Sequence, residues 1–166
     1  MQLFNTRGHK LQQFTPLHPD SVRMYSCGPT VYNHAHIGNL SSYIYADILR
    51  RTLKQCFGTT KHVMNITDVD DKTIRDSLAR YPDQPPRQAL RRLTDHYQQI
   101  FLDEMRAVGN NIDDITLVKA TDSIVEIQQL ILKLLEQRVA YVASDGIYFS
   151  VDTYAKKRQY GQLSHI

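Results

Sequence analysis

The chain has 166 residues, of which 42% are hydrophobic and 22% are charged, and its formal net charge is +3 at pH 7. This composition is typical of a globular protein and excludes a low-complexity chain, while the small charge gives little support for a nucleic-acid partner. No apolar run approaches the roughly 18 residues that span a bilayer, and residues 1–20 contain no apolar signal segment. The two cysteines, Cys27 and Cys56, cannot form a disulfide framework. We therefore expect a cytoplasmic protein with no membrane insertion.

The first part of the chain predicts a strand, a helix and a second strand. Residues 22–26 read as a buried strand that ends at Gly28-Pro29. Helical spacing of apolar residues predicts a helix over 37–55, which Gly58 ends. Residues 61–66 predict the second strand. We expect the inward face of the helix to carry Ile37, Leu40, Ile44, Ile48, Leu49 and Leu53.

This order predicts a βαβ crossover with a parallel sheet. Ligands of such sheets bind at the carboxyl ends of the strands, where Cys27 and Thr67 lie. The following DVDDK opens another helix with acidic residues in its first turn, and Thr67 is the expected cap.

The later elements follow from the same patterns. YPDQPP, residues 81–86, predicts a loop, and a stripe of apolar residues predicts a long helix over 90–108. A further helix is expected over 122–137, with its apolar side turned inward. Ala140–Val142 and Ile147–Phe149 flank Ser-Asp-Gly, which indicates a β-hairpin.

HIGN, residues 36–39, lies at a predicted helix start and is a candidate phosphate site. Helix N-termini present unpaired backbone N–H groups and a positive dipole end. Gly38 would let a phosphate approach the backbone, and His36 and Asn39 would supply side-chain donors. The alternative is that these residues only cap the helix.

Cys27 has a structural interpretation, as a buried thiol, and a functional one, as a zinc ligand together with His34 and His36. A covalent nucleophile has less support, because no base is fixed beside it. Cys56 is expected in the core. Two further groups are open to a functional interpretation, but a structural role is favoured for both. Asp68, Asp70 and Asp71 could bind magnesium. Phosphate could be bound by Arg50 and Arg51 or by Arg91 and Arg92, but we expect these arginines to be solvated.

CGPTVY, HIGN, YADILRR and NITDVDDK occur in an order that resembles the amino-terminal half of the catalytic domain of cysteinyl-tRNA synthetases, which are class I aminoacyl-tRNA synthetases. The resemblance runs from LFNT near the start to YVASDGIYFSV and YGQLS near the end. It implies an α/β fold: a Rossmann-like (HUP-type) parallel-sheet half domain over residues 1–110. Residues 111–166 would begin a connective insertion with a helix and a β-hairpin.

The resemblance also implies a reaction in two steps. Cysteine attacks the α-phosphate of ATP, with magnesium, to give cysteinyl adenylate and pyrophosphate, and the cysteinyl group then passes from AMP to the terminal adenosine of tRNA(Cys). The family's zinc would bind the substrate thiolate, and His34 would support the loop. The implied roles are catalysis by His36 and Asn39, ATP binding by His36, Gly38 and Asn39, a cysteine pocket at Gly28 and Thr67, and zinc ligation by Cys27.

Sequences of this family continue well beyond the position of Ile166, and the other zinc ligands have no counterpart here. We expect this polypeptide to bind zinc weakly or not at all, to show no aminoacylation alone and to be monomeric. We favour a shortened piece of a longer enzyme over a natural fragment that acts with a partner. Three other functions stay open: a ligase that joins cysteine to a sugar-inositol amine, a small nucleotidylyltransferase, which would need neither Cys27 nor NITDVDDK, and a non-catalytic synthetase-like binding module.

Overall fold

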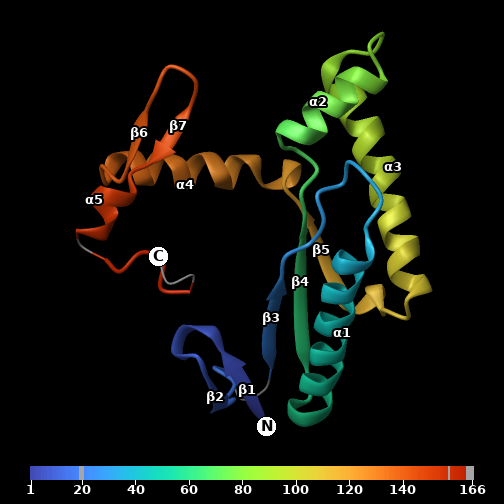
Figure 1. Cartoon of the computed structure of the whole chain (residues 1–166), viewed down its shortest axis with the longest axis vertical. Coiled ribbons are helices and arrows are strands. Elements are labelled where there is room, and N and C mark those ends of the chain that lie inside the picture. Colours follow the sequence, from blue (N-terminus) through green and yellow to red (C-terminus); the bar gives the residue numbers. More distant parts are fainter. Residues whose placement is uncertain (19–20, 157, 164–166) are drawn as a thin grey trace. The chain divides into compact units, whose positions relative to one another are not determined.

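The computed structural model of the chain describes residues 1–18, 21–156 and 158–163 (Figure 1). Ser164, which ends the YGQLS stretch, lies outside them. The chain divides into two compact units, one formed by Pro16–Ser123 and the other by Met1–Thr15 with Ile124–Ile166. No helix of the described residues is long and apolar enough to cross a membrane.

The larger unit is built on a parallel sheet. Its strands are β3 (Val22–Ser26), β4 (Thr60–Ile66) and β5 (Ile115–Lys119), in the order β3-β4-β5. His62 of β4 pairs in register with Met24 on one side and with Ile115 on the other. The predicted parallel βαβ unit is confirmed, whereas β5 was not predicted from the sequence.

Three helices accompany this sheet. They are α1 (Ile37–Phe57), α2 (Asp71–Arg80) and α3 (Pro86–Ala107), and α1 lies against β3 and β4 while α2 packs on α3. Figure 1 shows α2 at the end where β3 and β4 point their arrowheads. The core between sheet and helices is made by Val31, Tyr43, Met64, Ile66, Phe101, Met105, Ile112 and Ile115.

The boundaries of α1 agree with the prediction, whereas α3 begins at Pro86, inside the predicted loop 81–86 and ahead of its predicted start at residue 90, because proline suits the first turn of a helix. Gly58 ends α1 with a φ of 81°, as its position after the apolar stripe predicts. The expected cap of α2, Thr67, is wrong: Asp70 is the N-cap, and its carboxylate accepts from the backbone N–H of Thr73 at 2.8 Å. Thr67 instead forms an isolated bridge with Thr30. It therefore belongs to the sheet edge rather than to the helix.

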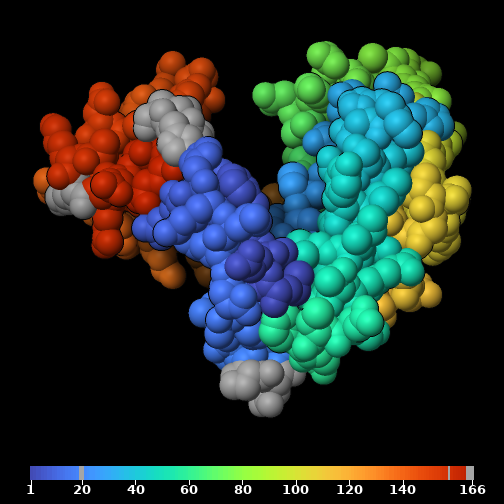
Figure 2. Space-filling view, turned by 60° about the horizontal axis from the view of Figure 1, so that its bottom comes forward, coloured from blue at the N-terminus to red at the C-terminus, as the bar shows by residue number. Residues whose placement is uncertain are grey.

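The predicted inward face of α1 is only partly right. Ile37 is 81% exposed and Ile48 is 55% exposed, and Figure 2 shows much of α1 (teal) at the surface. Cys56, expected in the core, is exposed. The residues of α1 that are buried are Tyr43, Asp47, Arg50 and Leu53.

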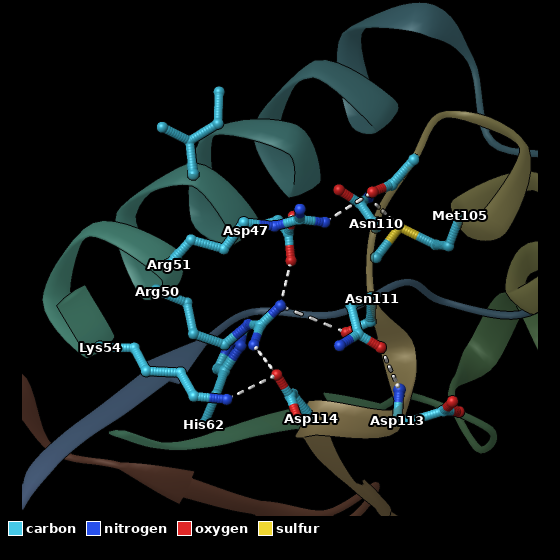
Figure 3. Close-up of polar contacts among 12 residues, drawn as sticks. Asp47, Arg50, Arg51, Lys54, His62, Met105, Asn110, Asn111, Asp113 and Asp114 are labelled. Atoms are coloured by element: carbon cyan, nitrogen blue, oxygen red, sulfur yellow. Dashed lines mark hydrogen bonds and ion pairs between the residues drawn. The ribbon is translucent and has the colours of Figure 1, made fainter. Parts of the chain in front are cut away.

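A buried ion-pair network explains this rotation of the helix (Figure 3). Arg50 is only 1% exposed, and its guanidinium donates to Asp114 at 2.6 Å and to Asp47. Arg51 donates to Asp47 at 2.6 Å and to the carbonyl of Gly109 at 2.7 Å. The expectation of a solvated side chain is therefore wrong for Arg50, while the Arg51 side chain is 55% exposed. These contacts tie α1 to the segment that leads into β5.

The smaller unit contains two antiparallel hairpins and two helices. The predicted hairpin is confirmed, and the predicted helix over 122–137 is confirmed as α4 after a short 3₁₀ turn at Thr121–Ser123. Its apolar side was expected to point inward, but no described residue of α4 is buried. The elements are β1 (Gln2–Asn5), β2 (Lys10–Gln13), α4 (Ile124–Glu136), β6 (Ala140–Val142), β7 (Ile147–Phe149) and α5 (Val151–Ala155). The domain boundary after residue 110 stays a prediction, although β5, which it assigns to the insertion, pairs with β4.

Candidate active site at the carboxyl edge of the parallel sheet

A cavity of about 380 Å³ lies where the chain leaves β3 and enters α1. It is lined by residues 28–36 of the connecting loop, by Asn39 and Tyr43 of α1, by Lys72 of α2 and by Phe101 of α3. The predicted site residues Gly28, His36 and Asn39 therefore share one cavity. Gly38, Cys27 and Thr67 border the same loop and strand ends without lining it.

His36 is the N-cap of α1. Its Nδ1 accepts hydrogen bonds from the backbone N–H groups of Gly38 at 3.1 Å and Asn39 at 3.3 Å, while Asn39 Oδ1 accepts from the His36 backbone N–H at 3.3 Å. Because Nδ1 is an acceptor, the ring proton of the neutral imidazole lies on Nε2. His36 thus presents a side-chain N–H donor.

This capping changes the expected role of the helix terminus. The backbone N–H groups of Gly38 and Asn39, which we expected to meet a phosphate, donate to His36 instead. A Cβ at Gly38 would lie 3.0 Å from Cε1 and 3.1 Å from Nδ1 of the same imidazole. A side chain at position 38 would therefore press on the His36 ring, which would have to shift by a few tenths of an ångström.

Cys27 follows β3 directly and is exposed, so the sulfur is not enclosed by aliphatic neighbours. Its thiol lies 3.6 Å from the carbonyl oxygen of Gly28. Burial raises the pKa of Tyr43 to about 12, and the neighbouring Cys27 adds to the rise. Tyr43 lines the cavity, and its hydroxyl stays protonated at neutral pH. The sulfur of Cys27 and the imidazole of His36 thus lie at the same edge of the sheet.

Gly28 and Thr67 are joined through the ends of β3 and β4. The backbone N–H of Thr67 donates to the carbonyl of Pro29 at 2.9 Å, and that of Val31 donates to the carbonyl of Thr67 at 3.1 Å. The Gly28 N–H donates to Asn65 Oδ1 at 2.9 Å. The predicted cysteine-pocket residues are therefore neighbours, held by a short extension of the parallel ladder.

α3 holds the other side of the loop. His34 Nδ1 lies 3.0 Å from Glu104 Oε1, and the backbone N–H of Ala35 donates to Glu104 Oε2 at 3.4 Å. The His34 ring also meets the Tyr97 ring edge to face, with centroids 5.7 Å apart. His34 supports the loop in this arrangement.

The acidic residues before α2 serve structural contacts. Asp68 is 4% exposed and accepts from the backbone N–H and the hydroxyl of Thr121 at 2.9 and 2.5 Å. Asp70 caps α2. These contacts account for the positions of both carboxylates, so the structural interpretation explains them and magnesium is not required.

The residues present do not fit a four-coordinate zinc. Within the described ranges, no three side chains of His, Cys, Asp or Glu come together closely enough to hold a metal ion. Cys27 supplies a single ligand, whereas structural zinc sites have four protein ligands and catalytic zinc sites have three.

Residues 13–166 match the sequence profile of the family described as tRNA synthetases class I (C) catalytic domain. The chain belongs to this family. It is 43% identical over 164 residues to the cysteine–tRNA ligase of Koribacter versatilis, and the matched region covers 99% of the chain and 31% of the relative. It is 39% identical over 166 residues to the cysteine–tRNA ligases of Leptospira interrogans and Thermococcus gammatolerans, covering all of the chain and 33% of each relative. The chain thus spans about a third of the length of the curated relatives it matches.

The cavity and the segments beside it also involve residues that the sequence patterns did not single out. Asn65 and Lys72 lie inside the NITDVDDK motif, so closer attention to that motif could have found them. Tyr43 lies one turn after Asn39 on the same side of α1, which is a weaker signal. Glu104 comes from a different helix, and no local pattern marks it.

Proposed function

We propose that this chain is the part of a cysteine–tRNA ligase that binds ATP and cysteine, within an enzyme that forms cysteinyl adenylate and passes the cysteinyl group to tRNA(Cys). The observation that carries the proposal is the position of Gly28, His36 and Asn39 around one cavity at the carboxyl edge of the parallel sheet. Family membership and the names of the relatives support the same activity. We also propose that the protein is cytoplasmic and monomeric.

Each residue has a role that follows from its contacts. His36 donates through Nε2–H to a phosphate oxygen of ATP, and the side-chain amide of Asn39 supplies a second donor. Such preorganised donors stabilise the charge that builds up on the α-phosphate during attack by the cysteine carboxylate. Gly38 allows the His36 ring to sit over the first turn. Gly28 and Thr67 border the cysteine, next to Cys27.

Zinc and magnesium belong to the proposed parent enzyme. Zinc binds soft sulfur ligands well, so it would select a thiol over a hydroxyl. Cys27 would be one ligand of a set that the described residues do not complete. Magnesium would accompany ATP. The residues of this chain bind and orient the two substrates.

ATP binding, followed by isothermal titration calorimetry, tests the proposal. The variant His36→Asn keeps a side chain that caps helices well but loses the Nε2–H donor. We expect it to weaken ATP binding roughly tenfold or more, as for a lost hydrogen bond to a charged group. His96→Asn makes the same change at an exposed histidine of α3 and serves as the matched control. If the unmodified chain does not bind ATP, or if both variants bind it equally well, the proposal is wrong.

The acceptor decides between this activity and the ligase for a sugar-inositol amine. In the full-length enzyme that contains this chain, radiolabelled cysteine should appear on tRNA(Cys) and not on a glucosamine-inositol acceptor. Transfer to the amine alone would overturn the assignment of tRNA as acceptor. The match to a synthetase family speaks against the small nucleotidylyltransferase.

A further inference from the structure

Asn65 is the central residue of a hydrogen-bond cluster beside the cavity. It is a half-buried residue of β4, and its side-chain amide contacts three groups at the ends of β3 and β4. Oδ1 accepts from the backbone N–H of Gly28 and from the Tyr25 hydroxyl, both at 2.9 Å, and Nδ2 donates to Thr67 Oγ1 at 3.1 Å. One amide thus connects both residues of the predicted cysteine pocket.

The orientation of this amide follows from chemistry. A backbone N–H can only donate, so the atom of Asn65 that faces Gly28 must be the oxygen. The nitrogen then faces Thr67 and donates to its hydroxyl oxygen. Because Thr67 Oγ1 accepts from Asn65, its own proton points elsewhere, and no acceptor for that proton is found among the described residues.

Gly28 adds a steric reason for the same arrangement. A Cβ at this position would lie 1.8 Å from the backbone oxygen of Asn65 and 2.8 Å from Cγ of Met64. The loop therefore runs directly against β4, which brings the Gly28 N–H within reach of the short Asn65 side chain. The contact depends on an amide at position 65, since a hydroxyl on a shorter side chain would not span both Gly28 and Thr67.

We infer that Asn65 is a positioning residue: it fixes the Gly28 backbone and turns the Thr67 hydroxyl proton outward, toward an acceptor atom on the cysteinyl part of the ligand. This inference rests on the proposed function. The cysteinyl part is favoured over the nucleotide because Thr67 adjoins Gly28 and does not line the cavity with His36 and Asn39.

Asn65→Asp tests this polarity with almost no change of shape. The aspartate keeps an acceptor for Gly28 and Tyr25, but its second oxygen accepts the Thr67 proton and withdraws that donor from the ligand. We expect binding of 5′-O-[N-(L-cysteinyl)sulfamoyl]adenosine to weaken about tenfold, as for one lost hydrogen bond in a partly buried site. Binding of ATP alone should change less than twofold. Tyr25→Phe removes only the exposed partner of Oδ1 and is the matched control, with no expected change in either affinity.

A double-mutant cycle separates lost polarity from added charge. Thr67→Val removes the hydroxyl and should weaken the cysteinyl analogue to a similar extent. If Asn65 acts through Thr67, Asn65→Asp should have no further effect in the Thr67→Val background. A full tenfold effect that persists there would show charge repulsion and would overturn the inference.

Hydrogen exchange of the Gly28 amide provides a readout without any ligand. The amide should be protected in the unmodified chain and in Asn65→Asp, and should lose protection in Asn65→Ala. An amide that exchanges freely in the unmodified chain contradicts the inference. If the unmodified chain fails to bind the analogue, the proposed function fails, and the role of Thr67 fails with it. If it binds and Asn65→Asp binds equally well, the inference alone is wrong.

Discussion

Gly28→Ala is expected to be among the most damaging single-methyl changes in the larger unit. The added Cβ would lie 1.8 Å from the Asn65 backbone oxygen, whereas ordinary contacts begin near 3.4 Å. The loop and β4 would have to separate by about 1.6 Å, and the backbone of a strand cannot rotate out of the way as a side chain can.

That displacement removes the hydrogen bonds that hold the loop to the end of β4. The N–H of Gly28 loses Asn65 Oδ1, and the two backbone hydrogen bonds of Thr67, to Pro29 and from Val31, stretch with it. At about 1 kcal/mol for each bond, the change should cost about 3 kcal/mol of unfolding free energy. Native-state hydrogen exchange of the amides in β3 and β4 measures this quantity for the larger unit alone.

Gly109→Ala is the control in the same unit. A Cβ there meets no atom within 4 Å, but φ is +84°, so only the strain of a left-handed alanine remains, at about 1 kcal/mol. If the two alanine variants lose equal stability, the steric argument for Gly28 is wrong.

Three further predictions concern α1 and its contacts. His36→Ala should cost about 1 kcal/mol through the lost cap, while His36→Asn should cost much less; equal losses in hydrogen exchange of α1 would contradict the capping role. The pKa of buried His62 is lowered from 6.5, by burial first and then by Arg50, so its contribution to stability is complete above pH 6.5 and is lost as pH falls toward the lower folded-state value. His62→Gln should remove this slope from the pH dependence of urea unfolding, and an unchanged slope would exclude His62 as its source. Arg50→Met leaves the Asp47 carboxylate buried and poorly compensated, which should cost about 3 kcal/mol of unfolding free energy. Arg106→Met removes one partner of an exposed ion pair and should cost less than about 1 kcal/mol in the same assay. Equal costs would refute the importance of burial.

Local patterns predicted most helices and strands because their signals lie within the element itself. The helix α1 has a cap at His36, apolar residues at helical spacing and a glycine after its last turn. The strand β5 has a weaker signal, since Ile115 and Leu117 alternate over five residues only, after a glycine and two asparagines that resemble a loop. Its strand conformation depends on pairing with β4, which is separated from it by two helices.

Burial of charge could not be predicted in the same way. Arg50 looks like a surface residue because the sequence does not show that Asp114, 64 positions away, reaches its guanidinium. The same reason hides Glu104, which contacts His34 across 70 positions. His36, in contrast, was predicted from its own motif, because its capping contacts lie within three residues. Gly28 was predicted only through the family resemblance, since its partner Asn65 is 37 positions away.

The HIGN turn shows how the site's chemistry depends on contacts that a motif does not reveal. Its glycine was expected to admit a phosphate to the backbone, yet the space beside Gly38 is taken by the imidazole of His36. The imidazole in turn uses the free N–H groups of the helix terminus, so the donors left for an anion are on side chains: Nε2 of His36, the amide of Asn39 and the ammonium of Lys72, which also lines the cavity. In the proposed adenylate-forming reaction, these side-chain donors favour the transition state over bound ATP when they are held in place and aimed at the charge that develops on the α-phosphate.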